Sequence, residues 1–458
     1  MVFHIITITQ TPLVRFRIGV EDIVKRFGSV KEFLDLSLLR EGEDYILSPG
    51  GVTRMVYPFL QRLVNLGGSP WWVSLNPQAP PRVVANGIKI QHISVPTEKV
   101  KGYGKAKEVI WGAFHMIDES ASQAQDLLWM DEYIDYIYYN RKVAQTVDQL
   151  DREEDFDVIY VHDFQHLPLG TMLISIKPRI FRWHIPLEKS LIPDTWISSL
   201  ELYLNKYDTI IVSSKRYIRD LIEMGYKGRA VEMPPYVDPT QYRTPPREEI
   251  EKFASKYNID VDDKLILIVA RMDPMKGQDR AIKALKLVKE EIPRAKLMLV
   301  GNGSFSSSKN GIGLGKGERW ARYLSSLAYE LGLIDSVIMT GYLTQRELEA
   351  AYSRADVILL PSIIEGFGLV VVEGWLYKKP VIVSTRAGIA DLVRDGENGF
   401  IAEPDDIRGM AERIKEVLKN DKLAEELGIR GYETSKRCYI DTVLKEEMKV
   451  IEKTIEGR

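Results

Sequence analysis

Short apolar runs rich in β-branched residues recur along the chain, and longer segments with a helical spacing of apolar residues separate them. In the segment 279–290, for example, Ile282, Leu285 and Val288 recur on one side while Lys and Glu occupy the other. Continuous apolar runs are typical of parallel strands that are buried on both faces and joined by crossover helices. The sequence therefore predicts an α/β protein. The expected strands are residues 5–9, 71–75, 88–95, 158–161, 180–184, 209–213, 265–270, 297–300, 337–340, 357–360 and 381–384.

A proline-rich segment divides this pattern into two halves. Between Met233 and Pro246 there are five prolines in fourteen residues, too many for a helix interior or a central strand. We interpret it as an interdomain linker and hinge, and expect two doubly wound, Rossmann-like α/β domains that face one another across a cleft. The predicted domains are residues 1–238 and 239–438, with a last helix over 439–458 that crosses back to the first domain.

Two segments fit this scheme poorly. Residues 10–45 show a mostly charged helical pattern, over 20–25 and 30–39, and are predicted to form a helical insertion. Residues 304–319 are rich in Ser, Gly and Lys and are predicted to form a mobile loop.

Composition excludes several classes of protein. The 458 residues carry 62 Lys and Arg against 65 Asp and Glu, and this balance argues against a nucleic-acid binder that works by bulk charge. The single cysteine, Cys438, excludes an intrachain disulfide and a multi-thiolate metal site, and suits a reducing compartment. The first residues lack the features of a signal peptide, and no window holds 18 uninterrupted apolar residues. We therefore expect a cytoplasmic protein with no membrane insertion.

A pair of cations follows one strand of the second half. Arg271 and Lys276 lie five residues apart around a proline turn that leads into a helix. A fork-shaped guanidinium and a compact ammonium at one strand end suit the oxygens of a diphosphate. The alternative is two solvated charges on a loop.

A glycine-rich segment with two glutamates follows the strand over 357–360. Glycines let a backbone approach a ligand closely, and a helix start favours oxygen-rich anions. The two glutamates are eight residues apart, which predicts that both lie on one side of a helix and face the cleft. One could then accept hydrogen bonds from sugar hydroxyls and the other from ribose hydroxyls. The alternative is one glutamate that complements the helix dipole and one that is solvated. The segment consists of Glu365, Gly366, Phe367, Gly368 and Leu369, which open the helix, and of Glu373 inside it.

The first half places polar residues after two predicted strands. His162, Asp163 and His166 follow the strand over 158–161, and His184 ends the strand over 180–184. The carboxyl ends of parallel strands share one edge of a sheet, so these residues are candidates for binding an acceptor. The alternative is histidines that only pack or cap, and no acid-rich spacing supports a metal site here, so no metal is predicted.

Taken together, these motifs resemble the donor-site motifs of retaining glycosyltransferases of the GT-B fold. The resemblance is to the large family with glycogen synthase-like, sucrose synthase-like and trehalose synthase-like members, and it spans most of the chain. Any one motif is weak, but the set is specific. Supporting segments are Leu-Val-Gly-Asn-Gly at 299–303, Thr-Gly-Tyr-Leu at 340–343, Ala-Asp-Val-Ile-Leu-Leu-Pro-Ser at 355–362 and Asp-Gly-Glu-Asn-Gly-Phe at 395–400.

The resemblance implies roles for the donor residues. Arg271 and Lys276 would neutralise the departing nucleoside diphosphate, the backbone from Glu365 to Leu369 would bind the sugar, and Glu373 would hold the ribose. Tyr342 and Leu343 would lie beside the base. No metal cofactor is implied for catalysis, and stimulation by a divalent ion stays open.

The acceptor side resembles that of trehalose-forming members, with a closer match to the nucleotide-sugar-dependent trehalose synthases than to the trehalose-phosphate enzymes. The resemblance implies that Asp163 holds an acceptor hydroxyl and that His184 lies beside the anomeric carbon. Gly50 and Gly51 resemble the family's glycine loop near the diphosphate. This loop lies further from the first strand than the family's loop does, so a reshaped acceptor pocket is expected.

We therefore expect a retaining hexosyltransferase that moves glucose from a nucleoside diphosphate glucose to a sugar hydroxyl, forming trehalose when the acceptor is glucose. Same-face attack is favoured over a covalent intermediate, because no carboxylate has a clear claim to lie beneath the anomeric carbon. Open alternatives are a relative with a glycan, glycogen, mannosyl or sugar-phosphate specificity, an epimerase, a phosphorylase and a non-catalytic sugar-nucleotide sensor. Neither the base nor the subunit number follows from the sequence, and a homodimer stays open.

Overall fold

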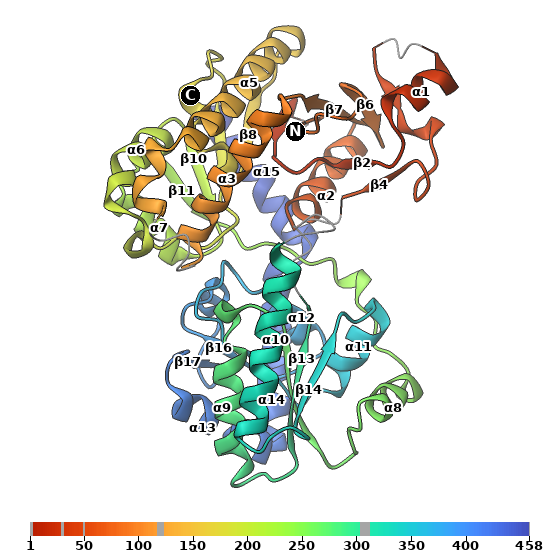
Figure 1. The fold of residues 1–458 in the computed structure, drawn as a ribbon, viewed down its shortest axis with the longest axis vertical. Helices are drawn as coiled ribbons and strands as arrows, with labels where there is room; N and C mark the ends of the chain where they lie inside the picture. The colour runs from red at the N-terminus through yellow and green to blue at the C-terminus, as the bar shows by residue number, and fades with distance from the viewer. Residues whose placement is uncertain (1–2, 29–31, 49–50, 117–122, 303–311, 458) are drawn as a thin grey trace. The chain divides into compact units, whose positions relative to one another are not determined.

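A computed structural model describes residues 3–28, 32–48, 51–116, 123–302 and 312–457. Contacts divide the chain into two compact units, and each is described by itself. Unit 1 comprises Met1–Met233 with Leu444–Arg458, and unit 2 comprises Pro234–Val443. Each unit is built around one large sheet with helices packed on it (Figure 1). Among the described residues, no helix is both long and apolar enough to cross a bilayer.

Unit 1 contains a nine-stranded sheet in the order β11-β10-β9-β8-β1-β5-β7-β6-β3. All neighbouring strands pair in parallel except β6 and β7, which pair antiparallel. Strand order reverses at β1, whose neighbours are β5 and β8, so the topological switch point lies beside β8. The strands are β1 (Ile5–Ile8), β3 (Leu34–Asp35), β5 (Trp71–Leu75), β6 (Arg82–Ala85), β7 (Ile88–Ile93), β8 (Val158–His162), β9 (Arg179–Arg182), β10 (Thr209–Val212) and β11 (Arg229–Glu232).

Helices bury the apolar strands of this sheet. Every residue of β1, β5 and β8 is buried, as their continuous apolar sequence predicts. The last part of the chain also packs on this unit, through α15 from Leu444 onward. The helices are α1 (Val20–Phe27), α2 (Gly51–Asn65), α3 (Thr97–Phe114), α5 (Asp131–Glu154), α6 (Asp194–Leu204), α7 (Lys215–Glu223) and α15 (Ile440–Glu456).

The predicted helical insertion over 10–45 is only partly present. Helix α1 is confirmed, but the helix expected over 30–39 is wrong in its described part. Leu34 and Leu36 are buried while Asp35 is exposed, an alternation that belongs to a strand. Asp35 then accepts the backbone N–H of Ser37 and closes a short 3-10 turn. Two further strands, β2 (Val14–Phe16) and β4 (Tyr45–Leu47), pair antiparallel in the same region.

Unit 2 contains a six-stranded sheet that is parallel throughout, in the order β14-β13-β12-β15-β16-β17. Strand order reverses between β12 and β15, which sets the switch point of this unit. The strands are β12 (Lys264–Val269), β13 (Ala295–Val300), β14 (Val337–Gly341), β15 (Val357–Leu360), β16 (Val381–Ser384) and β17 (Phe400–Ala402).

Helices cover both faces of the unit 2 sheet. Alternate residues of β12 enter two separate cores, with Leu265 and Leu267 in one and Ile266 and Ile268 in the other. The first core receives side chains from α11 and α12, and the second from α9 and α13. This arrangement confirms the doubly wound α/β prediction. The helices are α8 (Arg247–Lys256), α9 (Gln278–Lys289), α10 (Ile312–Glu330), α11 (Gln345–Arg354), α12 (Leu369–Leu376), α13 (Ile407–Lys419) and α14 (Asp421–Ser435).

The loop predicted over 304–319 is wrong from Ile312 onward, where α10 begins. Residues 304–311 lie outside the described residues. Tertiary contacts explain the helix: Leu324 and Ala328 are fully buried in the second core, and the Trp320 indole donates to Gln278 at 3.0 Å. These contacts outweigh the low helix propensity of the glycines.

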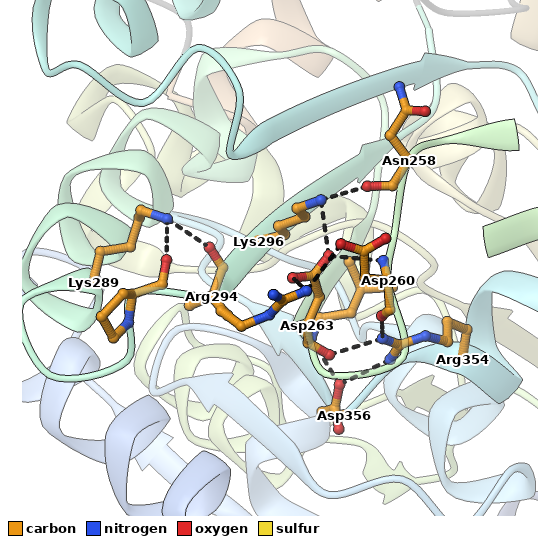
Figure 2. A network of polar contacts seen from close by, with 11 residues as sticks. Asn258, Asp260, Asp263, Lys289, Arg294, Lys296, Arg354 and Asp356 are labelled. Carbon is orange, nitrogen blue, oxygen red and sulfur yellow. Dashed lines mark hydrogen bonds and ion pairs between the residues drawn. The ribbon is translucent and has the colours of Figure 1, made fainter. Parts of the chain in front are cut away.

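A charged network ties together the amino ends of the unit 2 strands (Figure 2). The buried carboxylate of Asp263 pairs with Arg294 at 3.0 Å and with Lys296 at 2.8 Å. Arg354 donates to the carbonyl of Asp263 at 2.7 Å and pairs with Asp356 at 3.1 Å. These residues flank the starts of β12, β13 and β15, so the network stabilises the edge opposite the carboxyl ends of the strands.

Every strand predicted from the sequence is present, with small shifts at the ends. The sequence did not predict the short strands β2, β3, β4, β6, β11 and β17. Several of these lie at or near a sheet edge, where one side is solvated and polar residues are tolerated; β11, for example, reads Arg-Ala-Val-Glu.

Candidate active site

The two cations of unit 2 follow β12, at the switch point of the sheet. Asp273 accepts the backbone N–H of Met275 and caps the short turn that carries Lys276. Gly277 follows with a φ of 68°, and a Cβ there would lie 2.1 Å from the carbonyl oxygen of Pro361. Only glycine therefore allows this turn to pack against the segment that follows β15.

This packing joins the two donor motifs. The Lys276 ammonium lies 2.7 Å from the Glu365 carboxylate, and both side chains are largely shielded from solvent. The backbone N–H of Ile363 donates to the carbonyl of Met275 at 2.8 Å. Arg271 lies nearby in sequence, with its guanidinium 3.5 Å from Asp273. The structure thus brings Lys276 and Glu365 together although 89 residues separate them.

The prediction that Glu365 opens a helix is wrong. Helix α12 begins at Leu369, and Gly368 precedes it with a φ of 104°. Glu365 and Phe367 instead accept backbone hydrogen bonds from Gly388 and Ile389, at 3.3 and 2.8 Å. Glu365 therefore lies on an extended loop, and it does not share a helix face with Glu373.

The remaining residues of this loop are buried or half-buried. Gly366 lies so close to Gly388 that a Cβ on Gly388 would meet its carbonyl at 2.4 Å. Phe367 is buried in the core, and Leu369 is half-buried at the start of α12. The backbone from 365 to 369 is thus held in place by tertiary contacts.

Glu373 lies in α12, and two tyrosine hydroxyls donate to it. Tyr242 donates to Oε1 at 2.9 Å and Tyr352 donates to Oε2 at 2.6 Å. Neither tyrosine was predicted from the sequence. No local signal marks them, because they lie 131 and 21 residues from the glutamate.

Tyr342 and Leu343 follow β14 and point to different environments. Tyr342 is 65% exposed, whereas Leu343 is buried in the core. Tyr342 alone of the two thus presents its side chain at the surface, and Leu343 can contribute through its backbone.

In unit 1, Asp163 and His184 follow the adjacent strands β8 and β9, beside the switch point. The backbone N–H of His184 donates to the Asp163 carboxylate at 3.3 Å. The ring nitrogens of His162 and His184 lie 3.0 Å apart. Asp163 also has a φ of 69°, a strained conformation for a residue with a side chain and one that is enriched at functional sites. The structure therefore places these three residues together.

Burial disfavours the charged form of each member of this group. Burial raises the pKa of Asp163 to about 7. Burial, together with the nearby charge of Arg182, lowers the pKa of His184 to about 3, and it lowers the pKa of His162 well below its usual value. A carboxyl and two neutral imidazoles can exchange hydrogen bonds with sugar hydroxyls.

His166 belongs to the core. It is fully buried, its ring lies 5.5 Å from that of Tyr139, and burial lowers its pKa to about 3. In the part of the chain that the structure describes, no group of three or more His, Cys, Asp or Glu residues could hold a metal ion.

A buried ion pair lies beneath the unit 1 group. Glu447 of α15 accepts from Arg182 and from the Tyr160 hydroxyl, both at 2.5 Å. All three side chains are at most 3% exposed. This contact was not predicted from the sequence, because it joins residues that are 265 and 287 positions apart.

The glycine loop predicted near the diphosphate lies partly outside the described residues. Gly50 is one of the residues that are not described. Gly51 is the first residue of α2.

Known proteins match both units. Residues 249–434 match the family described as Glycosyl transferases group 1, and residues 123–219 match the family described as Trehalose synthase, N-terminal domain. A trehalose synthase from Thermococcus litoralis is 30% identical over 67% of this chain and 71% of its own length. The chain belongs to the trehalose synthase family of glycosyltransferases. A trehalose synthase from Pyrococcus horikoshii is also 30% identical, over 67% of this chain and 70% of its own length.

Solved structures show that this glycosyltransferase has the GT-B fold. A UDP-forming trehalose-phosphate synthase from Burkholderia xenovorans superposes with a TM-score of 0.71 at 18% identity, over 100% of this chain and 99% of that one. A sucrose-phosphate synthase from Thermosynechococcus elongatus superposes with a TM-score of 0.67 at 18% identity, over all of both chains. The fold expected from the motifs is thus confirmed.

The candidate residues of the glycosyltransferase lie within the two matched ranges. Asp163 and His184 are inside the trehalose synthase range, and Lys276, Glu365 and Glu373 are inside the glycosyl transferase range. Each unit therefore carries one group of candidate residues at the switch point of its own sheet.

Proposed function

We propose that this glycosyltransferase transfers glucose, with retention of configuration, from a nucleoside diphosphate glucose to a hydroxyl of glucose, and so forms trehalose. The names of its relatives support this product. One structural observation carries the proposal. Lys276 and Glu365 meet at 2.7 Å at the switch point of unit 2, where a cation can face a diphosphate and a carboxylate can face a sugar.

In this proposal unit 2 binds the donor. The diphosphate gains negative charge as the bond to the sugar lengthens, so Arg271 and Lys276 stabilise the transition state more than the bound donor. The pairing of Lys276 with Glu365 holds the ammonium in place before the donor arrives, which lowers the reorganisation needed during reaction. These two cations supply the charge stabilisation, and the proposal requires no metal ion.

Unit 1 binds the acceptor in this proposal. A hydroxyl of the acceptor other than the attacking one donates to the Asp163 carboxyl, and the neutral His184 accepts or donates a hydrogen bond beside the sugar. The acceptor oxygen attacks the anomeric carbon from the face that the diphosphate leaves. The bond from that carbon to the phosphate oxygen breaks, and the acceptor's proton passes to the same phosphate oxygen.

The test is a panel of reactions. UDP-, ADP- and GDP-glucose are incubated with glucose, glucose 6-phosphate or a maltooligosaccharide, and the product is identified by NMR. The proposal expects α,α-trehalose from glucose. Donor consumption in the absence of acceptor favours an epimerase, binding with no turnover favours a sensor, and a product with inverted configuration contradicts retention.

A further inference from the structure

Two tyrosines hold the carboxylate of Glu373 from separate parts of unit 2. Tyr352 belongs to α11, whereas Tyr242 belongs to the proline-rich segment. Their hydroxyls donate to different oxygens of the same carboxylate, at 2.6 and 2.9 Å. The plane of the carboxylate is therefore defined at both ends.

Contacts other than the hydrogen bond to Glu373 also hold each tyrosine in place. Tyr352 is 1% exposed, and its ring stacks on that of Tyr377 with centroids 5.4 Å apart and planes 4° apart. Tyr242 follows a turn that Asp238 caps, and its neighbour Arg243 pairs with the buried Glu349 at 2.9 Å. The packing thus fixes each donor independently of what Glu373 binds.

The chemistry of a carboxylate makes this arrangement useful for recognising a diol. A carboxylate has about four acceptor positions, so two tyrosine hydroxyls do not exhaust its capacity. Orientation matters because two neighbouring hydroxyls can engage both oxygens only when the carboxylate plane faces them. Ligands held by a pre-oriented group lose less free energy to ordering that group on binding.

We propose that Tyr242 and Tyr352 are positioning residues that orient Glu373 toward the 2′- and 3′-hydroxyls of the donor's ribose. The inference rests on the proposed function, because the ribose belongs to the nucleoside diphosphate donor of that function, and the family resemblance assigns this ribose to Glu373. It adds a specificity: the site distinguishes ribose from deoxyribose nucleotides through groups that do not touch the nucleotide.

The experiment measures the binding of UDP, ADP and GDP by calorimetry, each beside its 2′,3′-dideoxy form. The unmodified protein is expected to bind at least one ribonucleotide about tenfold or more tightly than the dideoxy form, since charge-assisted hydrogen bonds are lost. Tyr242→Phe and Tyr352→Phe should each reduce that ratio to about threefold while the affinity for the dideoxy form stays unchanged. In a Glu373→Gln background, the tyrosine substitutions should have no further effect on the ratio.

The matched control is Tyr160→Phe, which removes a hydroxyl-to-glutamate hydrogen bond of the same kind in unit 1. It should leave the ratio unchanged. Thermal unfolding of each variant identifies any that does not fold. Tyr242 is only half-buried, so Tyr242→Phe alone tests the inference if the variant of the buried Tyr352 does not fold.

Four results overturn the inference. Equal weakening of both nucleotide forms shows that the tyrosines are merely structural, and an unchanged ratio shows that they do not orient Glu373. A wild-type protein that binds UDP, ADP or GDP without distinguishing the dideoxy form removes the ribose assignment and leaves glycosyl transfer intact. A protein that binds none of the three nucleotides overturns the inference and the proposed function together.

Discussion

The carboxyl edges of the two sheets differ in the charge state of the side chains that meet there. In unit 1, Asp163, His162 and His184 meet where burial keeps both histidines neutral at pH 7 and raises the pKa of Asp163 to about 7. In unit 2, Lys276 and Glu365 form an ion pair at the corresponding switch point. The strand topology is alike, so the fold alone does not set the chemistry of the edge. The charge state follows from which side chains are desolvated and what partners they find.

Near this group, unit 1 contains a buried ion pair between Arg182 and Glu447. Arg182 is two residues before His184 on β9, and its charge helps to lower the pKa of that histidine. The histidines at the edge of unit 1 are neutral chiefly because they are buried, and the charge of Arg182 adds to this effect. Unit 2 instead places a cation, Lys276, at the edge itself.

The largest expected effect tests the buried pair. Glu447→Ala leaves Arg182 charged and buried without its carboxylate, so the free energy of unfolding should fall by about 3–5 kcal/mol in urea denaturation. The double substitution Arg182→Met with Glu447→Leu should recover most of the loss, since an apolar pair of similar volume removes the buried charge. A loss below about 1 kcal/mol in the single variant would show that the contact is solvated in solution.

The second prediction concerns the presented cation. Lys276→Ala should lower kcat about 10²–10³-fold, the effect of removing one donor to a developing charge. Steady-state kinetics with the donor found in the panel measures it. Lys283→Ala, on the exposed side of α9, is the matched control. Unchanged turnover in Lys276→Ala would contradict the role proposed for Arg271 and Lys276.

The third prediction uses the pH dependence of stability. Histidines with a folded pKa of about 3–4, such as His92, His166 and His184, stabilise the fold above pH 6.5, and this contribution is lost as the pH falls toward 4. Asp163 acts in the opposite sense, because its pKa of about 7 lies above the unfolded value. Its contribution is complete below pH 4 and is lost as the pH rises through 7.

Asp163→Asn removes this opposing contribution. The free energy of unfolding should then rise more steeply with pH between 4.5 and 6.5, by up to about 1.4 kcal/mol per pH unit relative to the unmodified protein. Urea denaturation at several pH values measures both slopes. Equal slopes would show that Asp163 is ionised in the folded state.

The smallest expected effect is on a neutral contact of the same helix. Thr454 of α15 and Thr209 of β10 share a hydroxyl hydrogen bond of 2.8 Å, and both are buried. Thr454→Val should lower the free energy of unfolding by about 1 kcal/mol, far less than the loss of the Glu447 carboxylate. An effect as large as that of Glu447→Ala would mean that packing of α15, and not charge, dominates the contact.

Local patterns were enough to predict the strands and the order of the motifs. Buried parallel strands leave continuous apolar runs such as Val357–Leu360, and the motif residues lie directly after such runs. Local patterns misled where tertiary contacts override propensity: residues 312–319 are helical because α10 buries its apolar side, and Glu365 lies on an extended loop held by Gly388.

By itself, the sequence determined the α/β class, the position of the strands and which charged residues follow them, because each of these depends on neighbours within a few positions. Only the tertiary structure decided which of those residues meet. The contact of Lys276 with Glu365, the tyrosines on Glu373 and the pair of Arg182 with Glu447 all join distant parts of the chain. Such contacts depend on strand order and helix packing, and no local spacing of residues encodes them.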